Sequence, residues 1–266
     1  MTASRLPILA ALALLGACAP AATTGAGGTP DGARRAAPTT ARQLVARMHG
    51  DWDGRWYGTL EFRQLNTTFA AGGEQQSEWV ERQRVPRLLR IDFVAPQPNG
   101  SGIIFRNDSV YTFDAGTLAR SAAQLHPLLL LSADVYALPV DSTVAALGRL
   151  AIDTTVLRRD TWESRPVYVV GAAEGDSATS QFWVDAERML LVRLVHQQAT
   201  PSGRRVSTEY RFTYQDVGGF AVPSEILFVR DGRPFYRERY VDVQVDVPVD
   251  DALFDPALWS QGVPPS

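Results

Sequence analysis

One stretch in the C-terminal half decides the fold class, and it reads Val206-Ser207-Thr208-Glu209-Tyr210-Arg211-Phe212-Thr213-Tyr214. Valine, threonine and aromatic side chains occupy every second position, and serine, glutamate, arginine and threonine fill the positions between them. Since successive side chains of a β-strand point to opposite faces of the sheet, this alternation predicts a strand with one apolar face and one wet face. The stretch therefore indicates an antiparallel sheet that buries one of its faces.

The same period of two recurs on both sides of this stretch. Strand candidates cover residues 55–63, 77–85, 88–94, 102–106, 109–114, 156–160, 166–173, 179–185, 190–198, 204–214, 222–230 and 234–247. Asn107-Asp108 and Asp231-Gly232 fall between consecutive candidates and are typical of hairpin turns. About eleven or twelve strands with short connections predict one antiparallel meander, in a mainly β (α+β) domain, and not a series of βαβ units.

Two regions depart from the period of two. Thr39 or Thr40 can cap a short N-terminal helix. Residues 118–150 are rich in alanine and leucine, and we expect one or two helices there, one starting at Pro127 and a shorter one following the Asp141-Ser142 cap. Helices inserted midway through a large antiparallel sheet need an apolar surface to cover, and the concave face of the sheet supplies it.

The composition is that of an ordinary soluble globular protein. The 266 residues are 45% hydrophobic and 21% charged, with a formal net charge of −3. The basic residues are spread along the chain and slightly outnumbered by acids, which argues against a nucleic-acid partner. Cys18 is the only cysteine, so no disulfide forms within the chain and stability comes from packing.

Residues 1–17 are typical of a secretory signal peptide, because Arg5 precedes an apolar run that is too short to span a bilayer. The motif Leu15-Gly16-Ala17-Cys18 resembles a bacterial lipobox. That resemblance implies cleavage before Cys18, a diacylglyceryl group on its thiol, and a membrane anchor. Ala19 in place of Asp implies, by the same resemblance, the periplasmic face of the outer membrane. The alternative is a lone buried cysteine near an ordinary cleavage site.

Three further segments follow this signal peptide. Residues 18–38 are rich in alanine, threonine, glycine and proline and predict a lipid-anchored, flexible tether. Residues 39–258 form the predicted folded domain, and residues 259–266 a C-terminal tail.

The order and character of several segments resemble the LolA/LolB superfamily of envelope lipoprotein carriers, over roughly residues 40–256. After the leading helix, the resemblance lies in Trp56-Tyr57-Gly58-Thr59-Leu60-Glu61-Phe62, Pro86-Arg87-Leu88-Leu89-Arg90-Ile91-Asp92, Asp108-Ser109-Val110-Tyr111-Thr112-Phe113, Phe182-Trp183-Val184-Asp185, Leu191-Val192-Arg193, Tyr214-Gln215-Asp216, Pro223-Ser224-Glu225-Ile226 and Leu253-Phe254-Asp255-Pro256. It implies a strongly curved antiparallel half-barrel with an N-terminal helix and inserted lid helices over its mouth.

A half-barrel covered by helices can leave an apolar cavity, and we expect it to bind an acyl chain or the lipid of an acylated protein. The residues expected to line it are Trp56, Leu60, Phe62, Leu89, Ile91, Phe93, Tyr111, Phe113, Leu129, Leu130, Tyr210, Phe212, Ile226 and Phe228. The alternative for each of them is an ordinary place in the core. The alternative for the protein, which we expect to be a monomer, is an envelope interaction or stress-sensor module that binds a protein partner without carrying lipid.

The sequence contains no set of residues with the spacing of a known catalytic or metal-binding motif. His49, His126 and His196 lack the spacing of a metal site, and there is no G-x-S-x-G elbow, no glycine-rich phosphate loop and no H-E-x-x-H motif. We therefore predict no catalytic residue, no metal and no cofactor, and a protein that is not an enzyme.

Overall fold

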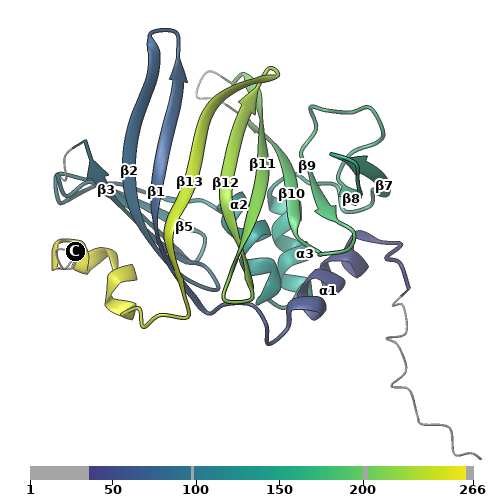
Figure 1. Ribbon diagram of the computed structural model, residues 1–266, viewed down its shortest axis with the longest axis horizontal. Helices are drawn as coiled ribbons and strands as arrows, with labels where there is room; N and C mark the ends of the chain where they lie inside the picture. Colours follow the sequence, from purple (N-terminus) through teal and green to yellow (C-terminus); the bar gives the residue numbers. More distant parts are fainter. Residues whose placement is uncertain (1–35, 97–98, 200–202, 262–266) are drawn as a thin grey trace, which may run out of the picture. The chain divides into compact units, whose positions relative to one another are not determined.

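The computed structural model describes residues 36–96, 99–199 and 203–261. Contacts separate the segment up to Ala37 from a compact unit that begins at Pro38. This unit is built on one sheet of thirteen strands, in the order β6-β5-β4-β3-β2-β1-β13-β12-β11-β10-β9-β8-β7. The end strands β6 and β7 do not pair with each other, so the sheet curves into a half-barrel without closing (Figure 1).

Every paired neighbour in the sheet is antiparallel, which confirms the predicted fold class. The strands are β1 (Thr59–Ala70), β2 (Gly73–Arg84), β3 (Leu88–Ala95), β4 (Gly102–Arg106), β5 (Ser109–Asp114), β6 (Thr117–Ala123), β7 (Leu157–Trp162), β8 (Arg165–Val170), β9 (Gln181–Asp185), β10 (Leu191–Ala199), β11 (Arg205–Val217), β12 (Phe220–Arg230) and β13 (Arg233–Val245).

The strand order explains why helices lie on the sheet. The chain runs outward from β1 to one edge at β6, then resumes at the opposite edge with β7 and returns to β13, which pairs with β1. Residues 124–156, here called the crossover segment, therefore have to pass from one edge to the other. They contain α2 (Pro127–Ser132), the 3₁₀ helix η1 (Asp134–Tyr136) and α3 (Val140–Arg149). A half-barrel offers its concave face as the short route between the edges.

The N-terminal helix α1 (Ala41–Trp52) begins as the sequence predicts, because the Thr40 hydroxyl accepts a hydrogen bond from the Gln43 amide at 3.2 Å. It packs against α3 and η1, and the helices lie together on one face of the sheet (Figure 1). No helix in the described part of the chain is long and apolar enough to cross a bilayer.

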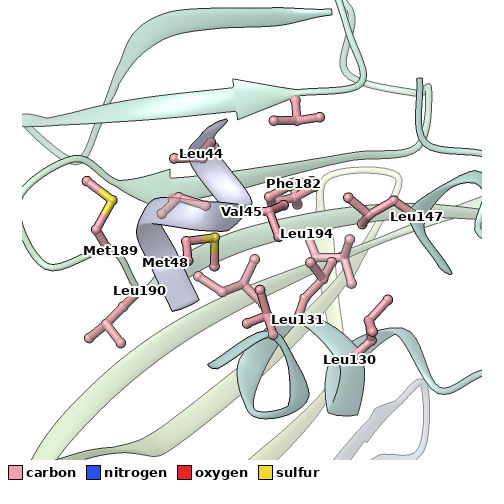
Figure 2. Close-up of a cluster of buried hydrophobic side chains, with 14 of the residues drawn as sticks. Leu44, Val45, Met48, Leu130, Leu131, Leu147, Phe182, Met189, Leu190 and Leu194 are labelled. Carbon is pink, nitrogen blue, oxygen red and sulfur yellow. The ribbon is translucent and has the colours of Figure 1, made fainter. Parts of the chain in front are cut away.

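The main hydrophobic core lies between these helices and strands β8 to β12. Leu44 and Met48 of α1 meet Leu131 of α2 and Phe182 and Leu194 of the sheet, and each of these side chains is fully buried (Figure 2). This cluster fills the part of the concave face that lies under α1 and α3.

Two predictions for residues 118–150 are corrected by the structure. Residues 117–123 form the edge strand β6 and not part of a helix, which raises the strand count to thirteen. Helix α3 begins at Val140 after Pro139, before the expected cap at Asp141-Ser142, and it is longer than α2. Helix α2 does begin at Pro127, as its fixed φ at a first-turn position predicts.

The C-terminal 3₁₀ helices η2 (Asp251–Phe254) and η3 (Pro256–Gln261) pack on the opposite, outer face of the sheet. Trp259 is 5% exposed and its ring stacks on Phe113 at 4.2 Å. A side chain at Gly102 would lie 2.1 Å from the Ile91 carbonyl oxygen and 2.6 Å from the Trp259 ring, so only glycine permits this close packing. The packed structure therefore includes Trp259, the first residue of the segment predicted to be a tail.

Candidate functional site

A cavity of about 280 Å³ lies on the concave face of the sheet, beneath α2. One part of its wall is apolar and comes from strands on both sides of β1 and from the helix. The apolar members include Leu60 of β1, Leu89 and Ile91 of β3, Ile226 of β12 and Leu129 of α2. The volume is just below the range of about 300–1,000 Å³ that is usual for small-ligand pockets.

Eight of the fourteen predicted ligand-binding residues line this cavity. They are Leu60, Phe62, Leu89, Ile91, Leu129, Tyr210, Ile226 and Phe228. The strand residues among them share one parity on each strand, which is why the alternation of the sequence brings them together. Contact with a ligand stays a prediction for all eight.

The other six lie elsewhere, for reasons that alternation and local packing explain. Tyr111 and Phe113 point to the outer face, where they pack with Ile104 and Trp259. Leu130 and Phe212 belong to the main core under the helices.

Two aromatic residues lie close to the cavity without lining it. Trp56 precedes β1 and is held between Tyr57 and Tyr136, at ring separations of 4.8 and 3.9 Å. Phe93 packs on Trp79 at 5.0 Å, and Trp79 is itself a cavity residue.

The remaining wall of the cavity is polar, and the alternation in the sequence did not predict it. Glu81 and Gln83 of β2, Gln64 of β1 and Glu238 of β13 all line the cavity and are all at least nine-tenths buried. The signal that identifies them is parity, because Trp79, Glu81 and Gln83 alternate along one face of β2. Charged side chains are rarely buried, so in the sequence Glu81 and Glu238 are read as residues of a solvent-facing strand surface. This expectation conceals that they share a face with the apolar residues of the cavity.

Pairing between strands places the two glutamates on either side of β1. Glu81 pairs with Phe62 and Glu238 pairs with Asn66. Gln64 is two residues from each of these β1 positions and shares their face, so it lies between the glutamates in the register. Its Nε2 donates to the Asn66 Oδ1 atom at 2.8 Å, which fixes the amide inside this polar region.

Burial changes the protonation of both carboxyl groups. Burial raises the pKa of Glu238 to about 8, and a hydrogen bond with Gln64 offsets part of the rise. Burial, followed by the charge of Glu238, raises the pKa of Glu81 well above its ordinary value. At neutral pH the Glu238 carboxyl group is therefore held mainly in its neutral form, because moving a carboxylate from water into the protein interior is costly.

Helix α2 covers the cavity, and side-chain hydrogen bonds hold the segment in place before and after this helix. The His126 Nδ1 atom accepts a hydrogen bond from the Leu129 amide at 3.0 Å and caps α2, and its ring meets Phe105 edge-to-face at 4.4 Å. Burial lowers the pKa of His126 to about 4, so the imidazole is neutral and can accept this bond. After α2, the Asp134 carboxyl group accepts from the Arg87 amide at 3.0 Å and ties the segment to the turn between β2 and β3.

The described residues contain no group of three or more His, Cys, Asp or Glu side chains arranged to hold a metal ion. His126 caps a helix at the cavity, whereas His49 lies on α1 and His196 on β10. The cavity thus has an apolar part and a polar part that contains two carboxyl groups.

The fold is similar to those of solved structures. The first, with a TM-score of 0.53 and 14% identity, is a LolA superfamily protein from Nitrosomonas europaea, and the alignment covers 83% of this chain and 99% of that one. The chain has a LolA-like fold. No protein-family model matches the sequence, and no curated protein matches it significantly.

Two other structures share the LolA-like fold of this chain. A DUF1329 family protein from Desulfovibrio piger aligns with a TM-score of 0.57 and 12% identity over 82% of this chain and 97% of that one. A protein assigned as an outer membrane lipoprotein-sorting domain, from Vibrio parahaemolyticus, aligns with a TM-score of 0.54 and 9% identity, over 83% and 99%. At these identities the likeness concerns the fold. Cys18 and the predicted signal peptide lie outside the described residues.

Proposed function

We propose that this protein is a lipid-anchored envelope lipoprotein that binds the apolar chain of an amphiphilic ligand in the concave cavity. The observation that carries the proposal is the incomplete filling of the concave face. Helix α1 and strands β8 to β10 form a packed core, while about 280 Å³ remains open next to Leu60, Ile91 and Ile226. Burying an alkyl chain there contributes about 25 cal/mol per Å² of apolar surface removed from water.

The fold neighbours support the proposal at the level of architecture. One of them is assigned as an outer membrane lipoprotein-sorting domain, and another is a LolA superfamily protein. A role in lipid or lipoprotein trafficking at the outer membrane follows by analogy of fold, together with the lipobox-like motif that ends at Cys18. Neither line of support involves a reaction, which favours a binding protein over an enzyme.

The size of the cavity indicates how a chain would enter. A volume near 280 Å³ suits one alkyl chain better than two, given the range that small ligands occupy. Helix α2 has six residues, so a small displacement of this helix would enlarge the cavity. Lids of this kind commonly open on the microsecond-to-millisecond timescale.

Filling the cavity from the helix side tests the proposal. In the Cys18→Ser protein, which lacks the predicted lipid, a neutral naphthylamine probe should bind saturably with a rise in fluorescence. Leu129→Trp places an indole where the alkyl chain of the ligand would lie, and we expect it to weaken binding of the probe about tenfold. Leu118→Trp is the matched control, because Leu118 is 49% exposed on β6. No saturable binding to the parent protein, or equal binding by both variants, would contradict the proposal.

A protein partner is the second candidate, and the edge strand β6 favours it. Six of its seven residues are exposed and its outer edge is unpaired in the sheet, which is the geometry that accepts an added strand. Crosslinking in intact cells separates the two functions. Lipoproteins or lipids as the main adducts support the carrier, whereas one stable protein joined to residues 117–123 supports the interaction module.

A further inference from the structure

We propose that the head group of the amphiphile is an anion, a carboxylate or a phosphate monoester, and that it binds beside the cavity to His196, Thr208 and Arg230. These three residues, here called the rim cluster, come from β10, β11 and β12. The inference rests on the proposed function and adds the chemical class of the head group. It is carried by a buried imidazole nitrogen without a hydrogen-bond partner and by an arginine without a carboxylate partner, both within the described part of the chain.

The pairing of three neighbouring strands brings the rim cluster to the concave face of the sheet. His196 pairs with Thr208 across β10 and β11, so their side chains share a face. The Arg230 Nη2 atom donates to the Thr208 hydroxyl at 3.2 Å, which joins the third strand to this pair. The shared face is the concave one, because Tyr210, two residues from Thr208, lines the cavity.

The rim cluster borders the cavity on all three strands. Each of its members is two residues from a cavity-lining residue of the same strand, namely Gln198, Tyr210 and Phe228. Residues two apart on a strand share a face and are separated by about 7 Å, so the cluster lies one side-chain position from the cavity. Burial and then the charge of Glu238 raise the pKa of Tyr210 to about 12, and the charge of Arg230 offsets part of this rise. The guanidinium is therefore close enough to act on a cavity residue.

The imidazole of His196 indicates a binding partner from outside the described chain. The residue is 8% exposed, and its Nδ1 atom is buried without a hydrogen-bond partner among the described residues. Buried polar side chains are nearly always paired, so this nitrogen lacks a group that a ligand can supply. Burial also lowers the pKa of His196, and the neutral ring can carry its proton on Nδ1 and donate it to an anionic oxygen.

The positive charge at the β12–β13 turn is a second, independent observation. Arg230 pairs with Arg233 across the turn, and like charges directly opposite each other are unfavourable. Both are exposed, and neither forms an ion pair with another described residue, including Asp231 in the turn itself. Phe235 lies 4.4 Å from the Arg230 guanidinium carbon and orients that group without neutralising it. A bound anion would reduce the repulsion between the two arginines.

The buried glutamates are too far along the sheet to oppose an anion at this place. Glu238 pairs with Ile226, which is four residues before Arg230 on β12, or about 13 Å along the strand. Glu81 lies on β2, three strands from β12. The amphiphile would thus follow β12, with its alkyl chain beside Ile226 and Phe228 and its anionic group at the rim cluster.

Three ligands with one alkyl chain and different head groups test the inference: decyl phosphate, decanoate and decanol. Each is used to displace the neutral naphthylamine probe from the Cys18→Ser protein at neutral pH, below its critical micelle concentration. We expect both anions to bind at least about tenfold more tightly than decanol, because charge-assisted hydrogen bonds are about twice as strong as neutral ones. Inorganic phosphate alone should leave the probe in place, because it has no chain to enter the cavity.

Substitutions in the rim cluster should act on the anions alone. Arg230→Gln should remove the preference for the anions while keeping decanol binding within about twofold. Arg239→Gln is the matched control, because Arg239 is exposed and, one residue from Glu238, faces the outer side of the sheet. His196→Phe keeps an aromatic ring without the donor, and we expect it to weaken both anions about fivefold and decanol not at all.

The outcomes separate this inference from the proposed function. If decanol binds as tightly as the anions, or if Arg230→Gln and Arg239→Gln have equal effects, the head-group inference is overturned and the cavity function stands. Displacement of the probe by inorganic phosphate alone would also overturn it. If none of the three alkyl ligands displaces the probe, both are overturned. Should His196→Phe fail to fold, Arg230→Gln, which changes an exposed side chain at a strand end, still decides the question.

Discussion

At the scale of single residues, His126 links the protonation state of the protein to the roof of the cavity. Its Nδ1 atom accepts the Leu129 amide bond, and burial lowers its pKa to about 4. Between about pH 6.5 and pH 4 the unfolded chain binds a proton at this position and the folded chain does not, so stability falls as the pH falls through this window.

We expect His126→Asn to remove that dependence, since asparagine also caps helices but does not titrate. Denaturant unfolding of both proteins between about pH 4 and pH 7 measures the difference, which should approach roughly 3 kcal/mol at the acidic end. Parallel curves for the two proteins would show that the imidazole is not held neutral by burial.

For Glu238 the dependence of stability on pH has the opposite sign. Its pKa is raised to about 8 by burial, so the stability linked to this carboxyl is present below about pH 4.5 and is lost as the pH rises toward 8. Glu238→Gln keeps the shape without the charge, and we expect it to be more stable than the parent by on the order of 3 kcal/mol near neutral pH and equal to it at about pH 4. Thermal unfolding against pH checks this, and a variant that is less stable at neutral pH would contradict it.

The sequence predicted the apolar wall of the cavity but not its polar wall. Period-two alternation brought Leu60, Ile91 and Ile226 to one cavity because parity depends only on local sequence. Parity alone did not identify which face of a strand is buried when charged residues occupy it, and Glu81 and Glu238 were missed for that reason. Burial of these groups depends on how far the sheet curves and on the helices above it, and both are tertiary features.

At the scale of elements, the pair of Arg90 and Trp259 is among the contacts that hold the C-terminal 3₁₀ helices to the outer face of the sheet. The Arg90 guanidinium is fully buried, binds both oxygens of Asp92 at 2.8–3.0 Å, and lies 4.0 Å from the Trp259 ring. The Trp259 Nε1 atom also donates to the Gly100 carbonyl at 2.9 Å. The pair of Arg90 and Trp259 joins β3, β4 and η3 into one packed unit.

We expect Trp259→Ala to destabilise the protein by about 3–5 kcal/mol, the usual effect of removing a buried tryptophan. Ser260→Ala, next in sequence and exposed, should change stability by less than about 0.5 kcal/mol. Urea unfolding of the two variants makes the comparison. Equal stability would mean that the domain ends before residue 259, as the sequence alone suggested.

The secondary-structure elements were predicted where apolar residues recur at a regular spacing in the sequence. Twelve of the strand regions show alternation, but β6 has six exposed residues in seven, so no apolar face marks it. Its alanine and leucine content suggested a helix because an edge strand is free of the packing that selects β-branched residues. Helix α3 starts earlier than predicted because Pro139, and not a side-chain cap, sets its first turn.

At the scale of the whole molecule, the proposed lipid anchor at Cys18 would hold the protein at a membrane. We expect Cys18→Ser to move the protein from the membrane fraction to the soluble fraction, since the thiol that would carry the acyl chains is gone. Fractionation followed by a high-salt wash measures this. A variant that remains in the membrane pellet after the wash would refute lipid anchoring through Cys18.

The central claim is that an alkyl chain lies between the concave face of the half-barrel and α2. Photolabelling the purified Cys18→Ser protein with a neutral alkyl diazirine, followed by peptide mapping, tests it directly. We predict adducts on β1, β3, β12 and α2, at positions such as Leu60, Ile91 and Leu129, that disappear with excess decanol. Adducts confined to the outer face around Phe113 and Trp259, or adducts that decanol does not reduce, would contradict the account.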